Sequence, residues 1–482
     1  MNHVTFMNVY LYDTKMLSYF AGSKIRKLSC LSSMKVSTTA FVLLTISCFV
    51  QLLLPVEGSL DKPLMLSPLI KKSQIKQAQN LSLVKDEKSV IPTSYAGFIT
   101  VDEKLGNHLF FWFFPSTSGA KSPLVVWLNG GPGSPSTLSL FDENGPIRLK
   151  NNGYERSNIS WTQTMSMLYI DNPVGVGFSY SDSGNAGYRI DQDGYSKDLY
   201  EFIQQFYILF PEYQKRELYI GGKSYAGKYV PAFAHYLHLK IKAGISNLPL
   251  TGIYIGCPFF DPFEQSLAIS DYLLAVGSIT RKEANLHKND IKEMFDEFQH
   301  NRLDISDSAK LVMRLYTKKA MDLPLKNYYS GEDPSSKNLS QFLNSTYLRN
   351  MVHVDNATLS ISNSELRNKM AKDILTSTKT KLAELVEKYK VLIYTGDFDA
   401  LTSPAMIDAA LLSMKWSRQE EYNNATRSFW LGDNGTLSGF YSRTGNLCQV
   451  VIKGAGHSAG YDQPKRAYNM MNFFIQKGCI SK

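Results

Sequence analysis

The chain has 482 residues, of which 44% are hydrophobic and 12% aromatic, and its formal net charge is +9. A chain of this length can bury a large core, and α/β folds of this size often form one domain. The positive charge is spread along the chain, with no dense basic block between aromatic residues, so we expect a solvated surface and no nucleic-acid binding.

The most apolar stretch lies near the N-terminus, between residues 38 and 55, and it is followed by a small-residue end at Gly58. This pattern resembles a secretory signal peptide. We therefore expect residues 1–58 to be an upstream segment and signal peptide, and no stable membrane span in the mature chain. An uncleaved anchor is the alternative, although the stretch is marginal in length for a span. Residues 59–90 are polar and lysine-rich, which predicts a mobile leader.

Sequons and cysteines fit a secreted or lysosomal protein. Seven Asn-X-Ser/Thr sequons favour a glycoprotein of the secretory pathway. They lie at Asn80, Asn158, Asn338, Asn344, Asn356, Asn424 and Asn434. After signal cleavage, Cys257, Cys448 and Cys479 remain, so at most one intramolecular disulfide can form, and its pairing cannot be deduced from the sequence. The cysteine spacing does not suggest a metal site.

Short apolar runs predict the strands of a sheet. Two runs, 98–101 and 108–114, predict a hairpin. Later runs are nearly continuous in apolar residues, as expected for parallel strands buried on both faces. They are residues 124–128, 167–170, 218–220, 253–255, 391–394 and 449–452. With helical patterns between them, they predict an α/β fold with a doubly wound, mostly parallel sheet.

A long helical segment interrupts this pattern. Between residues 261 and 385 the strand rhythm stops, and charged helical patterns take its place. We interpret this segment as a helical cap inserted into a core whose two parts are residues 91–260 and 386–482. No internal repeat indicates a further domain, and the oligomeric state stays unknown.

Ser224 lies in a strand–turn–helix context, between an apolar strand with two glycines and a run of small residues. This is the sequence form of a nucleophile elbow, whose acid and histidine follow the serine in that order. Two later candidate strands, 391–394 and 449–452, are followed by Asp399 and by a glycine-rich loop with His457. Each residue alone is also an ordinary turn or loop residue. Their order and their positions at strand ends favour a catalytic triad.

A second glycine-rich loop follows the strand 124–128. It reads Asn129-Gly130-Gly131-Pro132-Gly133, and Glu143 lies 14 residues after Asn129. Glycines at such a place let backbone N–H groups approach a ligand closely, as an oxyanion hole requires. A tight turn without a ligand is the ordinary alternative.

Together these motifs resemble those of the serine carboxypeptidases, from about residue 95 to the C-terminus. They are Trp127–Gly133, Glu143–Pro146, Asp171–Tyr180, Ser224–Pro231, Gly396–Asp399, Ala455–His457 and Tyr461–Pro464. Within the family, the chain is most similar to the vitellogenic-like and venom serine carboxypeptidases. The resemblance implies an α/β-hydrolase fold. It also implies a peptidase that releases C-terminal amino acids from peptides or proteins through an acyl-enzyme, without metal or organic cofactor.

The resemblance also assigns roles to the matching residues. Ser224 would be the nucleophile, His457 the general base and later acid, and Asp399 the group that orients the imidazole. The backbone N–H groups of Gly131 and Tyr225 would form the oxyanion hole. The substrate carboxylate would be bound by Asn129, Gly130 and Glu143.

Lys223 departs from the family, which usually has a glutamate before the serine. Two close carboxyl groups hold a proton tightly, and the protonated one can donate to a substrate carboxylate at acidic pH. Lys223 could bind that carboxylate directly, pair with Glu143 and occupy the site, or point elsewhere. We expect activity to survive with an optimum nearer neutral pH. The alternative is a catalytically weak, carboxypeptidase-like binding protein.

Two further departures affect other parts of the chain. The run Ser458-Ala459-Gly460 replaces a bulkier segment that commonly has proline at its third position, which predicts a less rigid histidine loop. Ser134 stands where many members carry a disulfide cysteine, so the usual disulfide framework is in doubt. An esterase or acyltransferase on the same fold is the remaining alternative, against which Asn129 and Glu143 argue.

Overall fold

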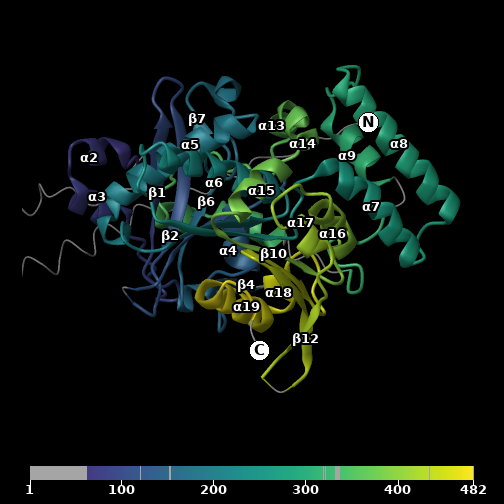
Figure 1. Ribbon diagram of the computed structural model, residues 1–482. Coiled ribbons are helices and arrows are strands. Elements are labelled where there is room, and N and C mark those ends of the chain that lie inside the picture. Colours follow the sequence, from purple (N-terminus) through teal and green to yellow (C-terminus); the bar gives the residue numbers. More distant parts are fainter. Residues whose placement is uncertain are drawn as a thin grey trace, which may run out of the picture. The chain divides into compact units, whose positions relative to one another are not determined.

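The computed structural model describes residues 62–119, 121–150, 153–317, 320, 322–331, 337–433 and 435–480. They belong to one unit, Leu60–Lys482 (Figure 1). The expected signal peptide and the sequon residue Asn434 lie outside the described residues. No helix in the described ranges is long and apolar enough to cross a membrane.

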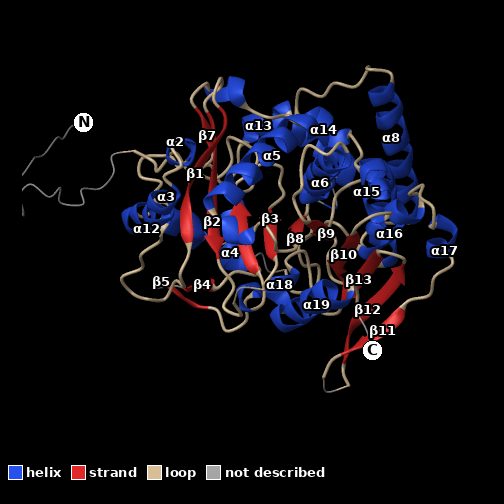
Figure 2. Ribbon diagram, turned by 60° about the vertical axis from the view of Figure 1, so that its left-hand side comes forward, coloured by secondary structure: helices blue, strands red, loops and turns tan. Residues whose placement is uncertain are grey.

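A mixed sheet runs through the unit (Figure 2). Its strand order is β1-β2-β6-β3-β8-β9-β10-β13-β12-β11, with β7 paired to β2. The central strands, from β6 to β13, pair in parallel, and the pairs at both edges are antiparallel. The strands are β1 (Tyr95–Asp102), β2 (Asn107–Phe114), β3 (Leu124–Leu128), β6 (Ser166–Ile170), β7 (Tyr180–Ser181), β8 (Leu218–Lys223), β9 (Leu250–Gly256), β10 (Lys390–Gly396), β11 (Ser428–Leu431), β12 (Leu437–Thr444) and β13 (Leu447–Ile452). A separate hairpin joins β4 (Ile147–Lys150) and β5 (Gly153–Arg156).

Helices cover both faces of the sheet (Figure 2). One face carries α5 (Gln192–Leu209), α6 (Ala226–Lys242), α15 (Lys379–Val386) and α16 (Pro404–Leu412), and the other carries α4 (Ser136–Asp142), α18 (Ala459–Asp462) and α19 (Pro464–Lys477). Because strand side chains alternate between faces, Val126 packs into the core beneath α5 and α6, and its neighbour Val125 packs into the core on the opposite face. The doubly wound sheet predicted from the apolar runs is thereby confirmed.

The segment 261–385 consists of helices in its described residues, with Ser360 forming an isolated bridge to Gly177. The helices are α7 (Pro262–Ala275), α8 (Arg281–Gln299), α9 (Ser308–Tyr316), α11 (Lys337–Leu343), α12 (Thr346–Met351), α13 (Ser364–Lys369), α14 (Ala371–Leu375) and α15. They do not form one separate cap. The helices α11 and α12 pack with α4 and α19 on one face, and α7, α8 and α9 join the core of the other.

The mobile leader expected for residues 59–90 is wrong for its described part, residues 62–90. This part forms α2 (Ser67–Lys71) and α3 (Ile75–Ser82). Met65 and Leu83 bridge to β1, and the side chains of Leu66 and Ala78 are buried. A few apolar residues on one side therefore dock the segment on the edge of the sheet, while its lysines stay exposed.

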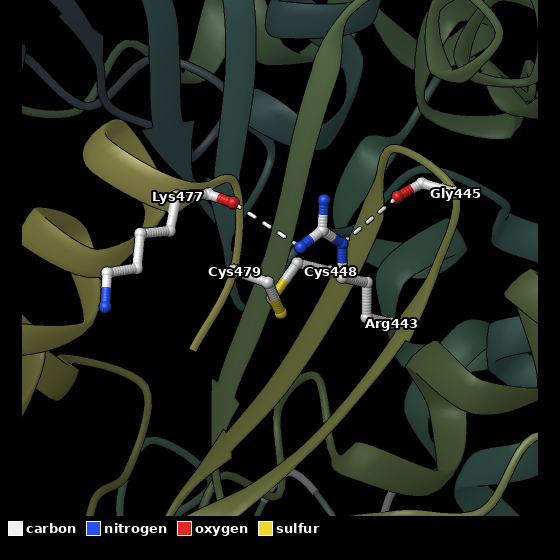
Figure 3. Close-up of a disulfide and its surroundings, with 5 residues drawn as sticks. All are labelled: Arg443, Gly445, Cys448, Lys477 and Cys479. Carbon is white, nitrogen blue, oxygen red and sulfur yellow. Dashed lines mark hydrogen bonds between the residues drawn. A yellow bond between two sulfur atoms is a disulfide. The ribbon is translucent and has the colours of Figure 1, made fainter. Parts of the chain in front are cut away.

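One disulfide joins Cys448 in β13 to Cys479, just after α19. It ties the last helix to the sheet, and Figure 3 shows the guanidinium of Arg443 donating to the backbone oxygens of Lys477 and Gly445 beside it. The pairing that the sequence left open is therefore Cys448 with Cys479. The remaining thiol, Cys257, is free and buried.

Candidate active site

A sharp turn between β8 and α6 presents Ser224. Its φ is +63°, in the left-handed region that is costly for a residue other than glycine. The turn is held by the Ser224 N–H, which donates to the Gly256 oxygen at 2.9 Å, and by the Ser224 oxygen, which accepts from Gly227 and Phe259. A side chain on Gly222 would place its Cβ 2.0 Å from the Leu128 oxygen, so the neighbouring glycine is required by close packing. This geometry is that of a nucleophile elbow.

Asp399 and His457 form a buried pair after β10 and β13. The His457 Nδ1 lies 2.9 Å from Asp399 Oδ2. The other oxygen, Oδ1, accepts from the N–H groups of Leu401 at 2.8 Å and Thr402 at 3.0 Å. Burial alone would raise the pKa of Asp399, but the facing His457 and these hydrogen bonds hold it below its usual value. The carboxylate therefore stays ionised and fixes the orientation of the imidazole.

Asp397, the other acid of the same motif, makes different contacts. Its Oδ1 accepts from the N–H groups of Gly454 at 2.7 Å and Ala455 at 3.3 Å. It therefore shapes the loop that leads to His457 without touching the ring. The structure therefore places Asp399, and not Asp397, against the histidine.

Ser224 lies beside this pair without a hydrogen bond to it among the described residues. Lys223, which precedes the serine, contacts Ser458, which follows the histidine: the Lys223 Nζ donates to Ser458 Oγ at 2.8 Å. The serine turn and the histidine loop are therefore neighbours. Catalytic hydrogen bonds are often long without substrate and tighten when substrate binds.

The glycine-rich loop after β3 reaches the same turn. A Cβ added to Gly130 would lie 2.5 Å from the Tyr225 nitrogen and 2.8 Å from the Ser224 Cβ. Glycine is needed here because the two backbones nearly touch. The loop thus lies against the Tyr225 nitrogen and Ser224, which is where an oxyanion hole would need it.

Asn129 braces the beginning of this loop. Its Nδ2 donates to the Pro135 oxygen at 3.0 Å, and its Oδ1 accepts from Ser139 Oγ at 3.3 Å. Its backbone N–H donates to Ser136 Oγ at 3.0 Å. The asparagine therefore holds the loop, and one Nδ2 hydrogen is left for a ligand.

Lys223 pairs with Glu143. The ammonium contacts Glu143 Oε2, and Glu143 Oε1 accepts from the Gly460 N–H at 3.1 Å. Burial opposes the charge of Lys223, but the attraction of Glu143 outweighs it and raises the pKa of Lys223. Of the three possibilities that the sequence left open, the structure shows the lysine paired with Glu143 and not pointing elsewhere.

Sequence reasoning missed the contacts that five residues make in this site. Thr402 donates to Asp399 Oδ2 at 2.9 Å, and the roles of Ser458 and Gly460 in binding Lys223 and Glu143 could not be read from the loop composition. The thiol of Cys257 lies close to Asp399 and His457, and ligand atoms of these three lie within 4.8 Å of one another. Ser136, the first residue of α4, whose Oγ accepts from the Asn129 N–H, was also not singled out.

The serine carboxypeptidase family model matches residues 85–477. The chain belongs to the serine carboxypeptidase family. It is 35% identical to a probable serine carboxypeptidase CPVL of Rattus norvegicus, over 87% of this chain and 91% of that one. It is also 35% identical to the venom serine carboxypeptidase of Apis mellifera, over 86% and 90% of the two chains. It is 34% identical to the vitellogenic carboxypeptidase of Aedes aegypti, over 88% of this chain and 92% of that one.

Among solved structures, the chain is similar to Kex1(delta)p, a prohormone-processing carboxypeptidase from Saccharomyces cerevisiae. The TM-score is 0.71 at 21% identity, over 83% of this chain and 96% of that one. This likeness confirms the α/β-hydrolase fold. This serine carboxypeptidase is therefore a hydrolase of the exopeptidase type, as its motifs predict.

Proposed function

We propose that this serine carboxypeptidase releases C-terminal amino acids from peptides through an acyl-enzyme on Ser224. The observation that carries the assignment is the ionised, buried Asp399 held 2.9 Å from His457 beside the strained serine turn. In the reaction, His457 Nε2 takes the Ser224 proton while Oγ attacks the scissile carbonyl. The histidine then gives this proton to the leaving amine as the C–N bond breaks. Water hydrolyses the ester by the reverse proton transfers.

The backbone N–H groups of Gly131 and Tyr225 would stabilise the oxyanion. Each such donor is worth about 3–4 kcal/mol of transition-state stabilisation. Tyr225 immediately precedes α6, so the positive end of the helix dipole supports the same site. The close approach of Gly130 to the Tyr225 nitrogen supports this arrangement.

The terminal carboxylate of the substrate would be bound beside the serine by Asn129, the Gly130 N–H and Lys223, with Glu143 contributing through the lysine that it holds. Lys223 supplies the positive charge, and Glu143 fixes the position of its ammonium. This group of donors favours an exopeptidase over an esterase or acyltransferase, since neither of those reactions needs a carboxylate site.

We also assign the chain to the secretory pathway, as a secreted or lysosomal glycoprotein. Five sequon asparagines have described side chains, and all five are exposed: Asn80, Asn158, Asn344, Asn356 and Asn424. Digestion of the secreted protein with an N-glycosidase should lower its apparent mass. No change in mass would contradict the glycoprotein assignment.

Labelling with a fluorophosphonate, followed by turnover of matched peptide and ester substrates, tests the mechanism. We expect the label on Ser224, loss of labelling in the His457→Ala variant, and release of amino acid from peptides. Turnover of esters alone would favour the esterase. A folded protein that neither labels nor turns over would favour the binding role.

A further inference from the structure

Glu143 is buried, and each of its carboxylate oxygens already has a partner in the protein. Its Oε1 accepts from the Gly460 N–H, its Oε2 is paired with the Lys223 ammonium, and its side chain is only 1% exposed. An ionised carboxylate only accepts hydrogen bonds, so it cannot bind the terminal carboxylate of a substrate directly. Glu143 therefore acts on a ligand only through the lysine that it holds.

The ammonium of Lys223 is the group that a ligand can reach. Its side chain is 12% exposed and lies next to the half-buried Ser224. Two of its three N–H groups are used, by Glu143 and by Ser458 Oγ at 2.8 Å, and the third has no partner among the described residues. An ammonium has no acceptor, so the site offers one free donor and a positive charge.

Lys223 and the run Ser458–Gly460, the two departures from the family described above, are joined through Glu143. Position 460 must lack a side chain, because a Cβ there would lie 2.4 Å from the backbone oxygen of Glu143. It must also keep its N–H, which donates to Oε1 of the Glu143 side chain. A proline would fail both requirements. We call Lys223, Glu143, Ser458 and Gly460 the Lys223 network.

We propose that the Lys223 network makes this enzyme select peptides with an ionised terminal carboxylate and reject C-terminal amides from acidic to slightly alkaline pH. The inference rests on the proposed carboxypeptidase function. A carboxylate gains a charged hydrogen bond from the free N–H of Lys223. The carbonyl oxygen of an amide can accept the same N–H, but the amide is neutral and gains the weaker hydrogen bond, and its NH₂ finds no acceptor on the ammonium.

The groups around Lys223 keep this selectivity constant with pH. The titratable groups that act on it are Glu143, the Cys257 thiol, Asp142 and Asp462. Burial raises the pKa of the thiol well above its usual range, so Cys257 stays neutral between pH 4 and 8. The direct contact with Glu143 favours the charged form of the lysine.

The test compares kcat/KM for an N-blocked dipeptide acid and the matching dipeptide amide at pH 5, 6.5 and 8. For the wild type we expect the acid to be preferred roughly 10- to 100-fold, the factor that corresponds to one charged hydrogen bond, at all three values. Lys223→Met should lower hydrolysis of the acid by a similar factor and change that of the amide less than about threefold. Lys223→Glu should keep the preference at pH 5 and lose it by pH 8, when both carboxyl groups are ionised. Lys282→Met, an exposed lysine on α8, is the matched control and should behave as wild type.

The same measurements separate a failure of the selectivity inference from a failure of the proposed carboxypeptidase function. A wild type that hydrolyses the acid but prefers it less than about threefold overturns the inference alone, as does a Lys223→Met variant that loses both activities equally. A folded wild type that hydrolyses neither substrate, yet is labelled at Ser224, overturns the proposed function and the inference with it. If the Lys223 variants do not fold, inhibition of the wild type by an N-acetyl amino acid and by its amide decides. The acid should inhibit at least about tenfold more strongly, and equal inhibition would contradict the proposal.

Discussion

The phenol of Tyr225 donates a 2.6 Å hydrogen bond to Asp373 in α14. Both side chains are buried, at 3% exposure each. The residue that follows the proposed nucleophile is therefore anchored by a helix almost 150 positions later in the chain. The inserted helices thus support the serine turn as well as surround it.

Removal of this hydrogen bond should weaken both the fold and the reaction. In the Tyr225→Phe variant a buried carboxyl group loses a donor, which should lower the free energy of unfolding by about 1.5–3 kcal/mol. We expect kcat to fall as well, because the Tyr225 N–H is a proposed oxyanion donor. Denaturant unfolding and steady-state kinetics measure the two effects. Tyr329→Phe, at a tyrosine that is 78% exposed, is the control, and an equal loss in both variants would contradict this account.

The two acids that follow β10 should differ sharply in their effect on catalysis. Asp399→Asn keeps the shape of the side chain but favours the wrong histidine tautomer, so kcat should fall by about 10⁴-fold. Asp397→Asn keeps an oxygen that can accept from Gly454 and Ala455, and kcat should fall less than about tenfold. Comparable losses in the two variants would show that Asp399 does not have the proposed role.

Asp171 should make the protein more stable in acid. Burial raises the pKa of Asp171 to about 7, although hydrogen bonds from Thr137 and Phe178 act in the opposite direction. A carboxyl group whose pKa is higher in the folded state stabilises the fold below its unfolded pKa, near 4. This contribution is lost as the pH rises towards 7. The free energy of unfolding of the wild type should therefore decrease over this interval.

The Asp171→Asn variant isolates that effect. The amide cannot ionise, so the unfolding free energy of the variant should vary less with pH between 4 and 7 than that of the wild type. Asp182→Asn, at an exposed carboxylate, is the control and should leave the wild-type slope unchanged. A wild-type slope that persists in Asp171→Asn would place its origin in other groups.

The disulfide between Cys448 and Cys479 should stabilise the attachment of α19. It closes a loop with a sequence separation of 31, for which chain entropy predicts a stabilisation of about 3–4 kcal/mol. Unfolding of a Cys448→Ala/Cys479→Ala variant under non-reducing conditions measures this contribution. Cys257→Ala keeps the disulfide and serves as the comparison. A double variant as stable as wild type would contradict the assigned role.

The core strands and the positions of the triad residues could be predicted from the sequence, because they depend on local signals. Parallel strands buried on both faces are continuous apolar runs, as at 124–128 and 391–394. Glycines around Ser224 likewise follow from the need for close backbone packing at one turn. The edge strands β11 and β12 were not predicted, since only some of their residues are buried and they contain no continuous apolar run.

The features that the sequence did not reveal depend on contacts between distant residues. Lys223 and Ser458 are 235 positions apart, and neither residue alone indicates its partner. The segment 62–90, which contains α2 and α3, was misread as mobile because its buried residues are few and it has six lysines. In both cases the charges were visible in the sequence, but the surface against which they pack was not.

The most direct test of the central claim is the release of C-terminal amino acids from N-blocked dipeptides between pH 4 and 8, with Ser224→Ala as the control. We predict release by the wild type that disappears in the control and continues to near-neutral pH, because Lys223 stays charged there. Release by Ser224→Ala at the wild-type rate would contradict the assignment of the nucleophile. No release by the folded wild type at any pH would contradict the carboxypeptidase function itself.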